Sequence, residues 1–91
     1  MLESAIEQSC VKALKKKGFL SIKLTSLKGL PDRMFISPRG DIFFVEFKKP
    51  DTGTLSPHQK YWMKELIDRN CVWFMTDNRK FFLDWVTHFY G

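Results

Sequence analysis

The amino-acid sequence predicts an α/β fold in which a central mixed β-sheet is flanked by helices. Three observations predict this class. Apolar residues recur with helical spacing in three segments, short apolar runs rich in β-forming residues lie between them, and a chain of 91 residues with 44% apolar residues suits one compact core. We therefore expect residues 1–91 to form a single domain with the element order αβββαβα.

The first predicted helix covers residues 2–18. An apolar residue recurs at every fourth position of this segment: Leu2, Ile6, Cys10 and Leu14. Gly18 follows three lysines, and basic residues in the last turn followed by a glycine are a typical helix stop signal. A short strand over residues 19–26 is expected next.

Residues 32–49 are predicted to form a β-hairpin. A glycine and a proline suit a turn before the apolar trio at residues 34–36, which suits a strand. The sequence SPRGD then suits a tight reversal, and DIFFVEFKK forms the returning strand. The two arms of this hairpin can bring Asp32 close to Glu46 and Lys48.

The second helix, over residues 56–70, has the clearest start signal in the chain. Ser56 suits the N-cap, a proline follows at the first helical position, and Gln59 completes a capping box of the form S-x-x-Q. The apolar run CVWFMT that follows is predicted to be a strand. Residues 77–90 return to helical spacing, with Asp77 as the expected N-cap.

The composition favours a nucleic-acid partner and argues against several other classes. Fifteen Lys and Arg residues against ten Asp and Glu give a net charge of +5 and a pI near 9.4. Two cysteines without zinc-type spacing indicate neither a disulfide framework nor a zinc site. Because no signal-like segment and no apolar run of ~20 residues is present, we expect a soluble, cytoplasmic protein without membrane contact.

The predicted strand FFVEFKK carries charges where a strand core normally has apolar side chains. Side chains alternate along a strand, so Glu46 and Lys48 share one face. Burying such groups without partners costs several kcal/mol, so they require each other, solvent or a metal ion. The simplest alternative is a solvent-facing ion pair on an edge strand, worth under ~1 kcal/mol.

Asp32 would add a second carboxylate to this strand face and make a metal site possible. Two carboxylates offer Mg²⁺ the oxygen ligands that it prefers, and the backbone carbonyl of Phe47 is a further candidate ligand. Lys48 beside the metal could orient a water molecule or help to deprotonate it, and could stabilise charge on a phosphate in transition. These are the requirements of metal-assisted phosphodiester hydrolysis.

The order of these residues resembles a known nuclease motif. Pro31-Asp32, followed fourteen residues later by Glu46 and then by Lys48, is similar to the motif of the PD-(D/E)XK nuclease superfamily. More narrowly, the chain resembles stand-alone VRR-Nuc domains, small nucleases of phages and bacteria, and Holliday junction resolvases. The likeness covers nearly all of the chain: the N-terminal helix with its glutamates, GLPDRMFI, FFVEFKKP and the helix that opens with LSPHQKYW.

The resemblance implies a restriction-endonuclease-like core and a Mg²⁺-dependent endodeoxyribonuclease. Mn²⁺ is expected to substitute for Mg²⁺, and no nucleotide cofactor is expected. Asp32 and Glu46 would be metal ligands and catalytic residues, and Lys48 would be the catalytic lysine.

The resemblance also implies a glutamate from the first helix in the site. Glu3 and Glu7 are one turn apart on the same helical face, so spacing does not separate them. We favour Glu7 as the metal ligand, because it lies eleven residues before Gly18, a spacing similar to that in archaeal-type junction resolvases. Gln59 resembles a glutamine of the family that would support the site or a phosphate, although its capping role equally explains it.

Five basic residues are candidate DNA contacts: Lys15, Lys16, Lys17, Arg33 and Lys49. The three consecutive lysines equally suit a solvated helix end that offsets the helix dipole. Aromatic residues in the last third of the chain outnumber what one thin domain readily hides, so we expect a homodimer that presents two active sites to two strands.

The resemblance makes branched DNA, especially four-way Holliday junctions, the expected substrate. Cleavage of flaps and general nicking are alternatives. Two other classes stay open: a non-catalytic nucleic-acid-binding module with a nuclease-like fold, and a small partner-binding protein. The presence of Asp32, Glu46 and Lys48 together favours the enzyme.

Overall fold

The structure, a computed structural model, describes residues 2–51 and 53–91. Its elements are α1 (Glu3–Lys16), β1 (Leu20–Lys23), β2 (Arg33–Ile36), β3 (Ile42–Phe47), α2 (Pro57–Asp68), β4 (Val72–Thr76) and α3 (Arg79–Tyr90). This order, αβββαβα, confirms the predicted α/β class. No helix in the described ranges is long and apolar enough to cross a membrane.

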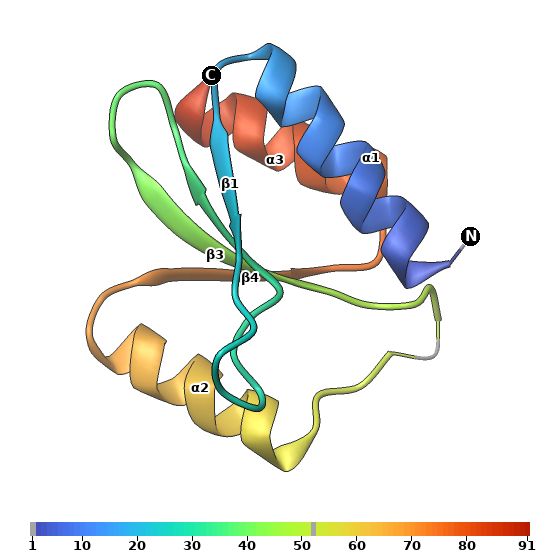
Figure 1. Ribbon diagram of the computed structural model, residues 1–91, viewed down its shortest axis with the longest axis vertical. Helices are drawn as coiled ribbons and strands as arrows, with labels where there is room; N and C mark the ends of the chain where they lie inside the picture. Colours follow the sequence, from blue (N-terminus) through green and yellow to red (C-terminus); the bar gives the residue numbers. More distant parts are fainter. Residues whose placement is uncertain (1, 52) are drawn as a thin grey trace.

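The four strands form one mixed sheet in the order β1-β2-β3-β4. β1, β2 and β3 are antiparallel neighbours, whereas β4 runs parallel to β3. A parallel pair needs a long crossover connection, and α2 lies within it. α1 and α3 lie on one side of the sheet and α2 lies on the other (Figure 1). The strand with the charged residues, β3, is therefore a central strand, and the edge-strand alternative does not hold.

Alternation along β3 separates the core from the charged groups. Phe43, Val45 and Phe47 are completely buried. They pack with apolar residues of α1 and α3: Ile6, Cys10, Leu14, Phe82 and Val86. Because side chains alternate, Phe44 and Glu46 point to the opposite face of the sheet. The central strand therefore anchors the core with one face and presents a carboxylate on the other.

We call this opposite face of β1, β2 and β3 the outer face. Residues paired across neighbouring strands share a face, and the pairing gives two apolar rows: Leu20, Ile36 and Ile42, and Ile22, Met34 and Phe44. Leu20, Ile22 and Ile42 remain 63%, 41% and 48% exposed. α2 lies on this side of the sheet without burying any of its own residues (Figure 1). The outer face is thus only partly covered.

Two element boundaries differ from the sequence prediction. The first strand covers four residues rather than residues 19–26, because it is an edge strand and only these four pair with β2. Asn78, not Asp77, caps α3: its side chain accepts a hydrogen bond from the backbone N–H of Phe81 at 2.9 Å. The capping box between Ser56 and Gln59 is confirmed in both directions.

The loop between β1 and β2 docks on the start of α2. The indole N–H of Trp62 donates a hydrogen bond to the carbonyl of Lys28 at 3.2 Å. Gly29 has a φ of +87°, and a Cβ built there would lie 2.5 Å from the backbone of His58. A glycine is therefore required at this position both by its backbone conformation and by the close approach of the helix.

Gly29→Ala is expected to destabilise the protein more than Gly40→Ala. Gly40 has nearly the same φ, +88°, but no atom of residues 2–51 and 53–91 outside its chain neighbours lies within 4 Å of its Cβ position. Both variants incur the cost of an L residue in the left-handed region, about 1–2 kcal/mol. Gly29→Ala adds a backbone clash worth roughly 1–3 kcal/mol more. Urea unfolding of the two variants measures the difference, and equal losses would contradict the docking described above.

Candidate active site

Three carboxylates meet at one end of the sheet. Among the described residues, Glu3, Asp32 and Glu46 each offer an oxygen atom, and these atoms lie within 4.8 Å of one another. Glu3 is in the first turn of α1, Asp32 immediately precedes β2, and Glu46 is near the end of β3. The hairpin therefore brings Asp32 and Glu46 together, as its sequence predicted, and α1 adds Glu3.

Asp32 is held in place by the neighbouring strand. Its Oδ2 atom accepts a hydrogen bond from the backbone N–H of Phe47 at 2.8 Å. Its backbone carbonyl accepts another from the N–H of Leu24 at 3.1 Å. These two contacts fix the residue between β1 and β3 and aim its carboxylate at the end of β3. Phe47, whose carbonyl we predicted as a ligand, thus contributes its amide to the site.

Glu46 is an unusually buried acid. The residue is 2% exposed. Burial, followed by the nearby carboxylate of Asp32, raises the pKa of Glu46 to about 8, although the Lys48 ammonium acts in the opposite direction. Without a metal ion to share its charge, this shift of the pKa favours the protonated form of the carboxyl group at neutral pH. A carboxyl group in this state is a candidate for a functional role.

Lys48 is positioned by Gln59. The Nζ atom of Lys48 donates a hydrogen bond to Oε1 of Gln59 at 2.8 Å and lies 3.8 Å from Oε2 of Glu46. The Nε2 atom of Gln59 donates to the same Glu46 oxygen at 3.1 Å. Oε1 of Gln59 also accepts a hydrogen bond from the N–H of Ser56, the cap of α2. Gln59 therefore caps its helix and also connects the lysine to the glutamate.

Glu7, which we favoured over Glu3, makes other contacts. Its Oε2 atom accepts hydrogen bonds from Nε of Arg33 at 2.6 Å and from Nζ of Lys23 at 2.9 Å. Burial alone would raise the pKa of Glu7, but the hydrogen bonds from Lys23 and Arg33 outweigh it and lower the pKa. A carboxylate engaged by two cations is less available to a metal ion. Among the described residues, Glu3, at the first turn of the same helix, is the α1 glutamate that lies in the carboxylate cluster.

The predicted basic contacts separate into different environments. Lys49 is exposed and lines an open hollow of about 430 Å³ together with Glu3 and Asp32. Arg33 faces inward toward Glu7, and its side chain is only 12% exposed. Lys49 thus lies beside the carboxylates. Arg33 instead forms an internal ion pair with Glu7. Lys23, which pattern reasoning did not select, lines the same hollow as Lys49.

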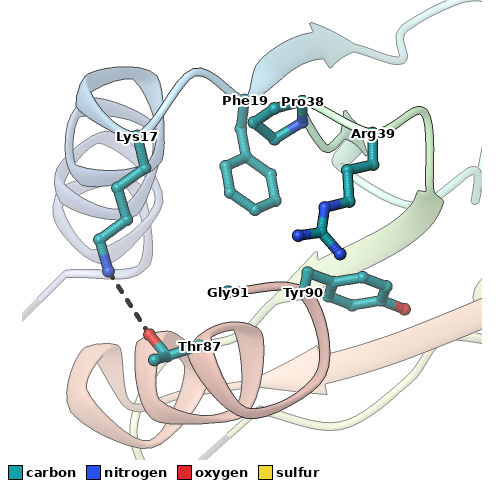
Figure 2. Close-up of a pocket in the computed structure, with 7 residues that line it drawn as sticks. All are labelled: Lys17, Phe19, Pro38, Arg39, Thr87, Tyr90 and Gly91. Carbon is teal, nitrogen blue, oxygen red and sulfur yellow. Dashed lines mark hydrogen bonds between the residues drawn. The ribbon is translucent and has the colours of Figure 1, made fainter.

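The three consecutive lysines diverge around the end of α1. Lys17 lines a second hollow, of about 390 Å³, with Phe19, Arg39 and Tyr90 (Figure 2). Its Nζ atom lies 3.4 Å from the hydroxyl oxygen of Thr87. Because α1 rises 1.5 Å per residue, this hollow is about 20 Å along the helix from the carboxylates. Lys15 and Lys16 are both exposed in the last turn.

Comparison with known proteins supports a nuclease-like fold. No family model and no curated protein sequence matches the chain. A solved structure described as a VRR_NUC domain superposes on it with a TM-score of 0.84 and 28% sequence identity, covering 98% of this chain and 97% of that one. The resemblance deduced from the sequence is therefore confirmed: over nearly its whole length, the chain is similar to a VRR_NUC domain.

Proposed function

We propose that residues 1–91 act as one metal-dependent endonuclease domain that hydrolyses phosphodiester bonds in DNA. The observation that carries the proposal is the meeting of Glu3, Asp32 and Glu46 within 4.8 Å, with the Lys48 ammonium 3.8 Å from Glu46. The similarity to a VRR_NUC domain supports the same reaction class. The net charge of +5 suits a polyanionic substrate in the bacterial or phage-infected cytoplasm.

The carboxylates fit a divalent metal ion. All three donors are oxygen atoms, which hard cations such as Mg²⁺ and Mn²⁺ prefer. The pKa of Glu46 is raised because the carboxyl group is buried and lies beside the Asp32 carboxylate. A bound divalent cation would stabilise the negative charge of both groups. Glu3, Asp32 and Glu46 would hold the ion, with the carbonyl of Phe47 as a further ligand. When bound, the ion would act as a Lewis acid and lower the pKa of a coordinated water.

Lys48 and Gln59 supply the remaining functions of the proposed site. In hydrolysis, a water oxygen forms a bond to phosphorus, the bond from phosphorus to a sugar oxygen breaks, and the water proton passes to the leaving oxygen. The Lys48 ammonium would stabilise the extra negative charge on the phosphate during this exchange. The Oε1 atom of Gln59 accepts a hydrogen bond from the Nζ atom of Lys48 at 2.8 Å, and this contact fixes the position of the ammonium.

The proposed substrate is branched DNA, in particular the four-way Holliday junction. Flaps and nicked duplexes are the alternative substrates of the same chemistry. A non-catalytic nucleic-acid-binding module with this fold is the competing function. It is less favoured because such a module would have no need of a buried carboxylate with a pKa near 8 beside a hydrogen-bonded lysine.

A cleavage assay tests the proposal. Labelled four-way junctions, flaps and linear duplexes are incubated with the protein and with Mg²⁺, Mn²⁺ or EDTA. We expect cleavage with either metal, none with EDTA, and the highest kcat/KM on the junction. Salt-sensitive binding without cleavage in any divalent ion would instead indicate the binding module. Failure to bind any DNA would reject both functions.

We place the proposed homodimer at the outer face of the sheet. Its two apolar rows carry no charged side chain, so this surface does not suit DNA, and a flat apolar patch can pair with its own copy about a two-fold axis. Glu46 lies on the same side of β3, so a dimer formed here would draw the two sites toward one another. Phe81 and Phe89 form a second exposed apolar surface on α3, at 64% and 62% exposure.

A pair of variants distinguishes the two surfaces. Ile42→Lys introduces a charge into the outer face and is expected to give a monomer, because an unpaired ammonium cannot be buried in an apolar interface. Phe89→Lys changes the α3 surface and is expected to leave the dimer intact. Light scattering across a wide concentration range measures both masses. A dimer that survives Ile42→Lys but not Phe89→Lys would move the interface to α3, and a monomeric wild type would exclude the dimer.

The pKa of Glu46 gives the proposed metal site a pH dependence. Below about pH 8 the carboxyl group of the metal-free protein holds a proton, which a divalent cation has to displace. We expect the apparent affinity for Mg²⁺ to rise about tenfold per pH unit up to about pH 8 and to level off above it. Calorimetric titration with Mg²⁺ at several pH values measures this curve, and a flat curve would be inconsistent with Glu46 as a ligand.

A further inference from the structure

Two hollows lie between α1 and β1, one beside Glu3 and Asp32 of the carboxylate cluster and one farther along the helix, and we call the two together the groove. The hollow beside the carboxylates is lined by Glu7 of α1 and Lys23 of β1. The farther one, a third hollow of about 250 Å³, is lined by Val11 of α1 and Ser21 of β1. Glu7 and Val11 are one helical turn apart, and Ser21 and Lys23 lie on the same face of β1. The two hollows therefore follow one another between the same two elements.

Lysines line both hollows of this groove, whereas the acids that line it, Glu3, Glu7 and Asp32, all belong to the hollow near the proposed metal site. Lys49 and Lys23 flank the end near the carboxylates, and Lys15 lines the far hollow. Glu7 adds little negative potential, because the ion pairs with Lys23 and Arg33 neutralise it and its side chain is only 7% exposed. The Lys23 side chain is still 49% exposed, so its ammonium contacts Glu7 on one side and is open to the groove on the other.

The far hollow combines this charge with an apolar lining. Val11, Phe19 and Leu20 contribute the apolar part, and none of the described residues in its lining is acidic. A cationic rim with an aromatic and aliphatic floor is the chemistry that accommodates a nucleic-acid strand, whose phosphates need cations and whose bases and sugars offer apolar faces.

We propose that the groove between α1 and β1 holds the DNA strand that leaves the metal site, with Lys23 contacting a phosphate near the site and Lys15 contacting one farther along the same strand. This inference rests on the proposed endonuclease function and adds the path of the substrate. Glu3 and Lys15 are twelve residues apart on α1, a span of about 18 Å along the helix axis. At about 3.4 Å per nucleotide of one strand, Lys15 meets a phosphate about five nucleotides from the cleaved bond.

The first test is the salt dependence of DNA binding by Lys15→Gln and a charge-matched control. Lys80→Gln removes one positive charge from α3, where the side chain is 85% exposed and paired with Asp84. Binding of a fluorescent junction is measured by anisotropy in Ca²⁺ at several salt concentrations. We expect Lys15→Gln to lower the slope of log affinity against log salt by about 1, and Lys80→Gln to leave it unchanged. Equal slopes for the two variants would overturn the groove.

The second test locates the contact along the strand. Single methylphosphonate linkages, which remove one phosphate charge each, are placed at increasing distances on both sides of the cleavage site. In the wild type, we expect kcat/KM to fall roughly two- to fivefold for a linkage about five nucleotides away on one side. In Lys15→Gln the same linkage should have no further effect, because the contact is already lost. A full additional loss in that variant would contradict the inference.

The outcomes separate this inference from the proposed function. Cleavage by the wild type with no distinction between Lys15→Gln and Lys80→Gln rejects the groove and leaves the endonuclease. Binding that depends on Lys15, without cleavage in Mg²⁺ or Mn²⁺, rejects the endonuclease and leaves the groove. Thermal unfolding of both variants establishes that neither change acts through the stability of the fold.

Discussion

Replacing Lys48 with methionine is expected to lower the kcat for DNA cleavage about a thousandfold, with little change in KM. Methionine keeps the length and much of the apolar volume of the side chain but lacks the ammonium. The charge that is lost lies 3.8 Å from Glu46 in a place where the Lys48 side chain is only 12% exposed. Preorganised charges in such water-poor sites contribute about two to three orders of magnitude to the rate.

The matched control for this variant is Lys64→Met. Lys64 lies on α2, is 71% exposed and pairs only with Asp68 in the part of the chain that the structure describes. Its loss changes the net charge of the protein by the same amount, and cleavage should remain at the wild-type rate. Single-turnover cleavage of a labelled junction measures both variants. If Lys48→Met cleaved as fast as Lys64→Met, the lysine would have no part in the reaction.

Arg33→Met is expected to lower the free energy of unfolding by about 3 kcal/mol, the largest loss of stability that we expect from removing one buried charge. The change leaves the carboxylate of Glu7, a residue only 5% exposed, with one of its two cationic partners. Removing one member of a buried ion pair costs about 3–5 kcal/mol, and the remaining contact with Lys23 favours the lower end of this range. Urea unfolding of the purified variant measures the loss.

The double variant Arg33→Met/Glu7→Met separates the ion pair from simple loss of packing. Removing both charges leaves no unpaired carboxylate, so most of the stability should return. Lys23→Met, at a half-exposed position, should cost under ~1 kcal/mol. A double variant no more stable than Arg33→Met would show that the arginine acts through its apolar contacts. Cleavage by the double variant also tests whether this ion pair is needed to hold Glu3, one turn away, at the metal site.

Local patterns were sufficient for the fold and for the convergence of Asp32 and Glu46. Alternation in FFVEFKK separated the buried Phe43, Val45 and Phe47 from Glu46, and the S-x-x-Q signal marked the start of α2. The convergence of Asp32 and Glu46 followed from the hairpin, because an antiparallel pair with a short turn has only a few possible registers. Each of these features depends on residues close together in the sequence.

The choice between Glu3 and Glu7 depended on contacts distant in the sequence. Both glutamates lie on one helical face, so the helix alone gives them equal access to the carboxylate cluster. Their roles are separated by Lys23 and Arg33, which are brought opposite one another by the pairing of β1 with β2. The sequence around Lys23 and the sequence around Arg33 contain no local pattern that predicts their contacts with Glu7. The spacing from Gly18 carries no information about these contacts, so the assignment of the metal-binding glutamate stays a prediction that the Mn²⁺ experiment below tests.

The divergence of the lysines at the end of α1 has a similar cause. Successive residues of a helix are separated by a rotation of about 100°, so Lys15 and Lys17 point to different neighbours. Lys15 lines the groove toward β1, whereas Lys17 turns to the hollow with Arg39 and Tyr90 (Figure 2). The sequence KKKG predicts a helix end. Which elements pack beside that end is decided by the tertiary structure.

Crystals of the protein grown with Mn²⁺ test the central proposal most directly, because anomalous scattering identifies the metal independently of the protein atoms. We predict an anomalous peak between the carboxylates of Glu3, Asp32 and Glu46, with Glu7 still paired to Arg33. In a matched crystal of Glu46→Gln the peak should be lost or strongly reduced. A fully occupied Mn²⁺ ion at another place in the protein, with no anomalous peak between these three side chains, would contradict the proposed active site.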